Sequence, residues 1–290
     1  MLAEQQNISK MKKKNILWLI AFALLMPLFA LTACSDDDDD DNNDSNGDKT
    51  EQTSNDGTKV LSKKVTKIVE GDENYGHTWY FDEDGRLTSE KDTDGKSTDI
   101  ITFNYSKDKI EVGESWTYLL ENGRVVEWRK DQDGGKYTYS SDGYLASYIC
   151  DDGDYLEEYK YIIENGNFTK IERLSTGYKY RSEESTSISY SSKLNNLNNV
   201  DLTAVLINME SLGNYFGKRS KNLPSTITKI DKETQTTYKG ETTEETYSEV
   251  ENFEYIYEGD YPVKILVEWT ETSNDDKPHS GTRTYEIFYE

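Results

Sequence analysis

Asp-Gly and Asn-Gly pairs recur through the sequence from Val60 onward, between short segments rich in Tyr, Trp, Val and Thr. Such a pair tolerates positive φ at both of its positions, as the centre of a two-residue type I′ β-hairpin requires. The residue types between the pairs favour strands, so each strand should pair with its neighbour in sequence. The pattern predicts an all-β fold, mainly an antiparallel meander of hairpins that forms an open or closed barrel-like sheet. Four pairs are candidate hairpin centres: Asp84-Gly85, Asn122-Gly123, Asp142-Gly143 and Asn165-Gly166.

The Asn122-Gly123 pair allows a prediction of strand register. With this pair at the turn, opposite charges meet beside it and apolar residues meet next to them, as cross-strand pairing prefers. The predicted partners are Glu121 with Arg124, Leu120 with Val125, Leu119 with Val126, and Thr117 with Trp128.

The sequence around the turns also repeats. YFDEDGRLT, LLENGRVVE, YSSDGYLAS and IIENGNFTK share an apolar or aromatic start, an acidic or polar stretch, a glycine, then a polar and an apolar residue. Repeated units of this kind predict one β-meander domain over residues 60–290.

One segment departs from the strand pattern. Apolar residues recur there at helical spacing, with Asp201 as a suitable N-cap and Gly213 as a C-terminal stop. They predict a short helical segment near 201–212 that plugs an end or lines the interior of the sheet, with core packing favoured over a ligand groove. The apolar residues are Leu202, Val205, Leu206, Met209 and Leu212.

The N-terminal region has the layout of a secretory signal peptide over residues 1–33. Lys12, Lys13 and Lys14 precede the apolar stretch 16–30, and Met11 is a more natural start than Met1. The apolar stretch is short for a membrane-spanning helix, which needs about 20 residues. The segment Leu31-Thr32-Ala33-Cys34 resembles the lipobox of bacterial lipoproteins, which implies cleavage before Cys34 and a membrane anchor through lipid on its thiol.

Residues 34–59 form the predicted tether that follows. The stretch 35–59 contains no aromatic or aliphatic residue, so it lacks the apolar surface that would offset the entropy of ordering, and we expect disorder. Its run of six aspartates resembles the acidic export signal of Bacteroides-type surface lipoproteins. That resemblance implies a lipid-anchored outer-membrane protein that faces the cell exterior.

Three segments of the domain resemble a Bacteroides lipoprotein family of unknown function with a porin-like fold. They are Tyr80 to Leu87, Asp201 to Leu212 and Tyr215 to Ile227, and the resemblance spans about residues 60 to 290. These motifs are structural turns, so the resemblance implies a fold and no catalytic residue. Glu127, Arg129 and Lys130 interrupt one strand-like segment, so we do not expect the continuous apolar face of a transmembrane barrel.

Charge excludes one large class of partner. The formal net charge is −23, and residues 1–33 carry four lysines and one glutamate, a net +3, so the remaining chain has −26. Phosphate binding needs clustered Lys and Arg, and we therefore expect no nucleic-acid partner.

The sequence offers few groups for catalysis. His77 and His279 lie in polar, loop-like contexts and are expected at the surface, while Cys150 is expected to be packed and inert. No zinc-ligand spacing, nucleophile elbow or phosphate-binding loop is present, so we predict no catalytic, metal or cofactor site. With 55 acidic residues outside the signal segment, 56 less Glu4, no single carboxylate pair is informative.

Aromatic residues give the most useful functional hint. The chain has 22 tyrosines and five tryptophans, and exposed rings of these types suit sugars or protein partners. For any single ring, including Trp116 and Trp128, we favour strand packing over ligand contact, and we expect Trp269 to pack within a strand. We predict a non-enzymatic binding module for a glycan or a surface protein, with ligand-binding residues unknown. The alternatives are an accessory component of an outer-membrane complex and a carboxylate-dependent glycan hydrolase.

Overall fold

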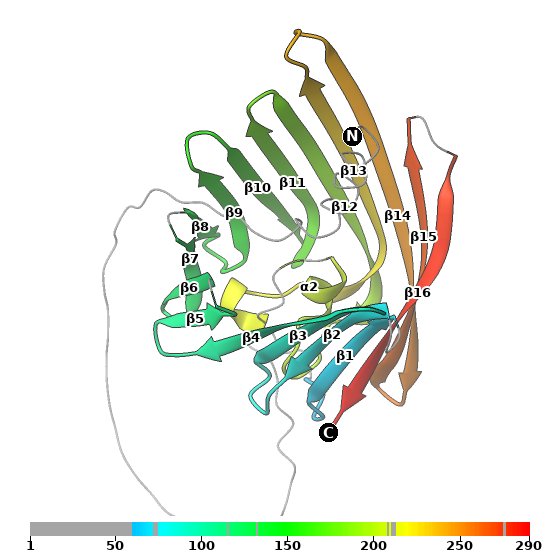
Figure 1. The fold of residues 1–290 in the computed structure, drawn as a ribbon. Helices are drawn as coiled ribbons and strands as arrows, with labels where there is room; N and C mark the ends of the chain where they lie inside the picture. The colour runs from blue at the N-terminus through cyan, green and yellow to red at the C-terminus, as the bar shows by residue number, and fades with distance from the viewer. Residues whose placement is uncertain are drawn as a thin grey trace, which may run out of the picture.

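The computed structural model contains sixteen antiparallel strands that close into one barrel (Figure 1). It describes residues 60–71, 75–114, 116–131, 133–207, 209, 213–274 and 277–290. Each strand pairs with its neighbours in sequence, and β1 pairs with β16 to close the ring. The predicted all-β meander is therefore confirmed, and the sheet is closed. The predicted signal segment, Met11, Cys34 and the tether lie outside the described residues.

The strands differ in length, so the barrel has a low wall and a tall wall. The low wall contains β1 Val65–Gly71, β2 Tyr75–Phe81, β3 Leu87–Asp94, β4 Thr98–Tyr105, β5 Lys109–Val112, β6 Trp116–Glu121, β7 Arg124–Lys130, β8 Asp133–Tyr139 and β9 Leu145–Asp151. The tall wall contains β10 Leu156–Glu164, β11 Asn167–Gly177, β12 Tyr180–Leu194, β13 Asn222–Thr236, β14 Thr242–Glu258, β15 Tyr261–Ser273 and β16 His279–Tyr289. Figure 1 shows the long hairpins rising above the rest of the ring.

All four candidate Gly pairs join consecutive strands, but they form two kinds of turn. Asn122 and Asn165 have φ values of 50° and 53°, and each is followed by a glycine of positive φ, as a type I′ turn requires. At the two Asp-Gly pairs only the glycine has positive φ, and the connections are the five-residue loops 82–86 and 140–144. The type I′ prediction is thus confirmed for the Asn-Gly pairs and wrong for the Asp-Gly pairs.

The predicted register of the β6–β7 hairpin holds only beside its turn. Glu121 pairs with Arg124 and Leu120 with Val125, as expected. A register shift then leaves Val126 as an extra residue, so that Leu119 lies opposite Glu127 and Thr117 opposite Arg129. The predictions of Val126 opposite Leu119 and of Trp128 opposite Thr117 are wrong, because this β-bulge moves the register by one residue.

The connection from β12 to β13 passes through the barrel interior at one end, and we call its described residues within 195–221 the plug. It contains helix α2 (Leu202–Leu206) and the short 3-10 helix η1 (Gly213–Phe216). All five residues of α2 are buried, and Asp201 caps it by accepting a hydrogen bond from the Ala204 N–H. The predicted core role of this helix is therefore confirmed. We call this end of the barrel the plug end and the opposite end the rim.

Helix α2 ends earlier than predicted. The Met209 N–H bonds to the Ala204 carbonyl, five residues back, so the regular four-residue ladder stops at Ile207. Met209 lies beyond the helix, and Leu212 lies outside the described residues. Within the described part of the chain, no helix is long and apolar enough to cross a membrane.

Side-chain hydrogen bonds fix the plug in place. Buried Asn195 donates from Nδ2 to Asp201, Thr203 and the Ser220 carbonyl. Arg219 donates to two carbonyls of the plug, and Asn199 bonds both the N–H and the carbonyl of Val65 at the start of β1. These bonds satisfy polar groups that would otherwise be buried without partners.

The two faces of the sheet differ in character. Residues of the inner face pack on the plug and form the hydrophobic core. On the outer face, charged residues two positions apart on one strand form ion pairs, since alternate residues share a face. These pairs are Lys109–Glu111, Arg129–Glu127, Lys160–Glu158, Lys170–Glu172 and Arg181–Glu183.

Candidate ligand site inside the barrel

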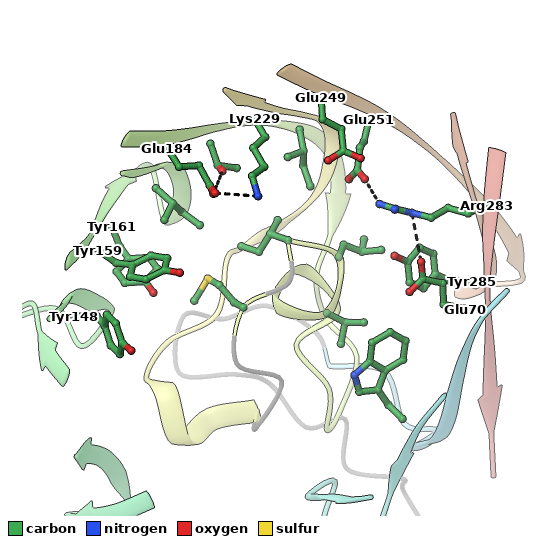
Figure 2. Close-up of a pocket in the computed structure, with 18 of the residues that line it drawn as sticks. Glu70, Tyr148, Tyr159, Tyr161, Glu184, Lys229, Glu249, Glu251, Arg283 and Tyr285 are labelled. Carbon is green, nitrogen blue, oxygen red and sulfur yellow. Dashed lines mark hydrogen bonds and ion pairs between the residues drawn. The ribbon is translucent and has the colours of Figure 1, made fainter. Parts of the chain in front are cut away.

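A cavity of about 360 Å³ lies inside the barrel on the rim side of the plug (Figure 2). Its floor is the end of α2 and the residues after it, Val205, Leu206, Ile207 and Met209. Inward-facing side chains of the strands form its walls, and the lining residues Glu70 and Arg283 keep 27% and 31% of their side-chain surface exposed. Solvent therefore reaches the cavity. Its volume is at the lower end of the range for ligand pockets, about 300–1,000 Å³.

One wall is built from tyrosines on three adjacent strands. Tyr137 on β8, Tyr148 on β9, and Tyr159 and Tyr161 on β10 all line the cavity. Neighbouring rings lie 5.1–6.3 Å apart, within the range of favourable aromatic pairs. Burial raises the pKa of Tyr159 well above its usual value, so its hydroxyl stays protonated at physiological pH.

A second aromatic pair lies across the cavity from the tyrosine wall. Trp79 on β2 stacks with Tyr285 on β16 at 6.3 Å between ring centroids. Trp79 is 4% exposed, and its Nε1 has no hydrogen-bond partner among the described residues. A buried indole N–H without a partner is a donor that a ligand oxygen could accept from. Figure 2 shows Tyr285 on the opposite side of the plug from Tyr148, Tyr159 and Tyr161.

The tall wall contributes a chain of alternating charges. Arg173 on β11 donates to Glu157 on β10 at 2.5 Å and lies 3.6 Å from Glu184 on β12. Glu184 also pairs with Lys229 on β13 at 2.9 Å. Burial raises the pKa of Glu157, although the Arg173 guanidinium opposes the shift.

A second charged group joins the two edges of the closing seam. Arg283 on β16 forms ion pairs with Glu251 on β14 and with Glu70 on β1, the latter at 3.6 Å. Glu70 lies directly opposite Tyr285 in the β1–β16 register. The Arg283–Glu70 pair exists only because the barrel closes, since its members come from the last and the first strands of the sheet.

Glu249 is the lining carboxylate without an ion pair among the described residues. It lies opposite Lys229 in the β13–β14 register, but the Lys229 ammonium pairs with Glu184. The Tyr247 hydroxyl lies beside Glu249 and Glu271, and burial together with these two carboxylates raises the Tyr247 pKa, so this hydroxyl stays protonated and can donate to one of them.

This arrangement is suited to binding rather than to proton transfer. Burial raises the pKa of two acids, Glu157 and Asp201, and neither lines the cavity. The Glu157 carboxylate accepts from Arg173 and Ser175, and Asp201 caps helix α2. Lining carboxylates pair with cations or lie beside a tyrosine hydroxyl, and aromatic and aliphatic side chains cover most of the remaining surface. Among the residues that the structure describes, no group of three His, Cys, Asp or Glu is placed to hold a metal ion.

The two histidines and Cys150 differ in how far their burial agrees with the prediction. His279 is exposed as predicted, but His77 is half-buried, because it bonds Asp92 at 3.2 Å and packs on Trp79. The surface prediction is therefore wrong for His77. Cys150 is buried, and burial raises the pKa of its thiol to about 11, so its predicted inert character is supported.

The predicted packing of the three tryptophans is confirmed in different degrees. Trp128 is buried in the core, while Trp116 and Trp269 are partly buried. The cavity residues themselves were not predicted from the sequence. Two pairs could have indicated them, Tyr159 with Tyr161 and Glu249 with Glu251. The members of each pair are two positions apart, so they lie on the same face of a strand.

Comparison with known proteins gives structural likenesses alone. No protein-family model matches the chain, and no curated protein sequence matches it. A porin-like protein from Bacteroides vulgatus ATCC 8482 is similar at 17% identity and a TM-score of 0.48, over 79% of this chain and 99% of that one. A porin-like protein from Bacteroides uniformis ATCC 8492 is similar at 16% identity and a TM-score of 0.46, over 78% and 96%. Neither likeness is close enough to transfer a site or a function.

Proposed function

We propose that this chain is a lipid-anchored protein of the outer-membrane surface, and that its barrel is a non-enzymatic module which binds a sugar unit of a glycan in the cavity. The cavity carries the proposal, because it combines facing aromatic walls with charged hydrogen-bonding groups. Aromatic faces with a few well-placed polar groups are the usual composition of sites for small ligands. Its volume fits a mono- or disaccharide rather than a long chain in full.

The anchor is proposed from the sequence around Cys34 and agrees with the outer face of the barrel. A transmembrane barrel presents a continuous apolar band to lipid, and an Arg or Lys in that band costs about 2–4 kcal/mol at the midplane, with a smaller cost for Asp or Glu. The ion pair of Arg181 with Glu183 and its counterparts lie on this face instead. We therefore place the barrel in water, held near the membrane by the lipid at Cys34.

A protein partner is the second candidate, favoured by tyrosines at the rim. Tyr178 and Tyr238 are 77% and 90% exposed, and Lys179 lies over both rings at 5.3 and 4.3 Å. These residues occupy neighbouring hairpin tips, where the Lys179 carbonyl accepts from the Thr236 N–H. Tyrosine is enriched among the residues that contribute most to binding at protein interfaces.

One experiment separates the cavity from the rim. We would screen the full chain on a glycan array and measure the best sugar by calorimetry with two variants. Tyr161→Ala removes a ring that lines the cavity and should weaken binding about tenfold or more. Tyr238→Ala removes an exposed rim ring and should leave the affinity unchanged. The opposite result would move the ligand to the rim and contradict the cavity proposal.

The same samples test the absence of catalysis. A bound glycan should be recovered intact after prolonged incubation with the chain, as judged by mass spectrometry. Release of shorter sugars that persists in independently purified preparations would favour the hydrolase alternative.

A further inference from the structure

We infer that the cavity selects a ligand that carries a protonated amino group beside a ring with oxygen acceptors, as an amino sugar with a free amine does. The inference rests on the proposed function and names its ligand class. Three observations support it: the lining has more carboxylates than cations, both lining cations are already in ion pairs, and the buried Trp79 N–H has no acceptor among the described residues.

The cavity lining has an excess of negative charge. Four carboxylates line it, and two cations do, Lys229 and Arg283, which leaves two negative charges uncompensated. Arg173 and Glu157 adjoin this group and add one charge of each sign, so they do not alter the difference. A cleft whose lining carries an excess of one sign of charge focuses the electric field and attracts ligands of the opposite charge. The four carboxylates are Glu70, Glu184, Glu249 and Glu251.

Both lining cations already have carboxylate partners. Lys229 Nζ lies 2.9 Å from Glu184, and Arg283 pairs with Glu251 and Glu70. An anionic ligand would have to displace one of these buried partners, whereas a cation needs no displacement. Truncating or displacing one partner of a buried pair is costly, because the other charge is left unpaired.

Glu249 is the lining group best placed to receive an ammonium. Its carboxylate faces the cavity without an ion pair among the residues that the structure describes, and it shares the nearby Tyr247 hydroxyl as a possible donor with Glu271. Facing aromatic rings can also stabilise the cation, because an ammonium within about 6 Å of a ring centroid is attracted to its face. Trp79, Tyr159 and Tyr161 supply such faces in the lining.

Trp79 adds an observation that is independent of charge. Its indole is 96% buried, and its Nε1 points to no acceptor among the described residues. A sugar hydroxyl or ring oxygen can accept this hydrogen bond. A ligand that satisfies both residues carries an amine to pair with Glu249 and an oxygen that accepts from the Trp79 N–H.

Three disaccharides with the same β-1,4 linkage test the inference. They are the glucosamine disaccharide with free amines, its N-acetylated form and cellobiose, each titrated into the full chain in mildly acidic buffer while Trp fluorescence and heat are recorded. We expect the free-amine sugar to bind about tenfold more tightly than cellobiose, a difference of about 1.4 kcal/mol. Raised salt should reduce this preference, because it screens partly exposed charges.

Matched variants on one strand locate the charge that is recognised. Glu249→Gln removes the unpaired lining carboxylate and should abolish the preference for the amine, measured as the ratio of the affinities for the free-amine sugar and cellobiose in the same variant. Glu254→Gln removes the same charge from the exposed face of β14 and should leave the preference intact. Equal losses in the two variants would show a long-range effect of net charge and overturn the assignment to Glu249.

The outcomes separate the inference from the proposed function. Equal or tighter binding of cellobiose overturns the amine inference and leaves glycan binding in place. Binding of spermidine without binding of any of the three sugars supports the amine and overturns the glycan. If neither the sugars nor spermidine bind, both proposals fail.

Discussion

Asp82 illustrates how one side chain sets the form of a turn at the plug end. Its Oδ1 accepts from the N–H groups of Asp84 and Arg86, and its Oδ2 accepts from the Arg86 guanidinium. Burial alone would raise the Asp82 pKa, but the hydrogen bonds and charge of Arg86 outweigh it and hold the pKa below its usual value. Ser140 occupies the equivalent place in the 140–144 loop, where its hydroxyl accepts from the Tyr144 N–H.

The two turns should therefore respond differently to pH. Asp82→Ala should lower the free energy of unfolding by about 1–2 kcal/mol at neutral pH, as loss of hydrogen bonds to a charged group does. A depressed pKa contributes stability above the unfolded pKa, about 3.9, and this contribution disappears as pH falls through the folded pKa. The penalty should thus shrink in acid when it is measured by urea unfolding.

Ser140→Ala is the matched control, because its hydroxyl does not titrate in this range. Its cost should be the same at both pH values. An Asp82→Ala penalty that does not change between neutral and acidic buffer would contradict the role of the charged carboxylate.

The reactivity of the Cys150 thiol tests whether this side chain is buried in the native chain. Its thiol is buried and its pKa is raised to about 11, so the reactive thiolate is scarce at neutral pH. In a Cys34→Ser background, we expect iodoacetamide to label Cys150 slowly in the native chain and rapidly in urea. Equal rates in the two states would show that the strand β9 opens freely.

At the scale of elements, local residue chemistry predicted the Asn-Gly turns correctly and the Asp-Gly turns incorrectly. Asn122 adopts positive φ because its short polar side chain tolerates that conformation, so the residue type alone predicts the turn. The five-residue loops depend instead on an acceptor at their first position, Asp82 or Ser140, which is less specific in sequence. The bulge at Val126 lies within a run of strand-forming residues, with no glycine or turn residue to mark it in the sequence.

The plug depends on the side-chain amide of Asn195. Asn195→Ala removes three hydrogen bonds and leaves Asp201, Thr203 and the Ser220 carbonyl short of a donor. We expect a loss of about 2–4 kcal/mol in the free energy of unfolding, measured by urea, because those acceptors are buried. Asn104→Ala, on an exposed face of β4, should stay within about 0.5 kcal/mol. Similar costs for both variants would mean that the plug is held by apolar contacts alone.

At the scale of the whole molecule, barrel closure assembled a site that sequence patterns did not reveal. Its lining residues extend from Glu70 to Tyr285, and the Arg283 group needs the pairing of β1 with β16. The meander predicted neighbouring strands, but the closing pair and the depth of each inward side chain depend on all sixteen strands together. The plug could be predicted as core because its apolar residues follow a helical period.

A barrel that lies in water should leave the membrane when its anchor is removed. In cells, Cys34→Ser should move the chain from the detergent-rich phase to the aqueous phase of a Triton X-114 separation. The unsubstituted chain serves as the control and should stay in the detergent-rich phase. Retention of the variant in the membrane after carbonate washing would contradict both the lipid anchor at Cys34 and a barrel outside the bilayer.

The chain enters the barrel from the plug end, where the Leu61 N–H bonds the Asn196 carbonyl and the Glu290 N–H bonds the Lys64 carbonyl. With a lipid at Cys34, the rim is then the part of the domain farthest from its point of attachment. A glycan that belongs to a bulky polymer, or to the surface of another cell, could place one terminal unit in the cavity while the rest of it stays in the medium. Because the rim points away from the lipid, the barrel would bind glycans on large polymers or on other cells more readily than molecules within the membrane.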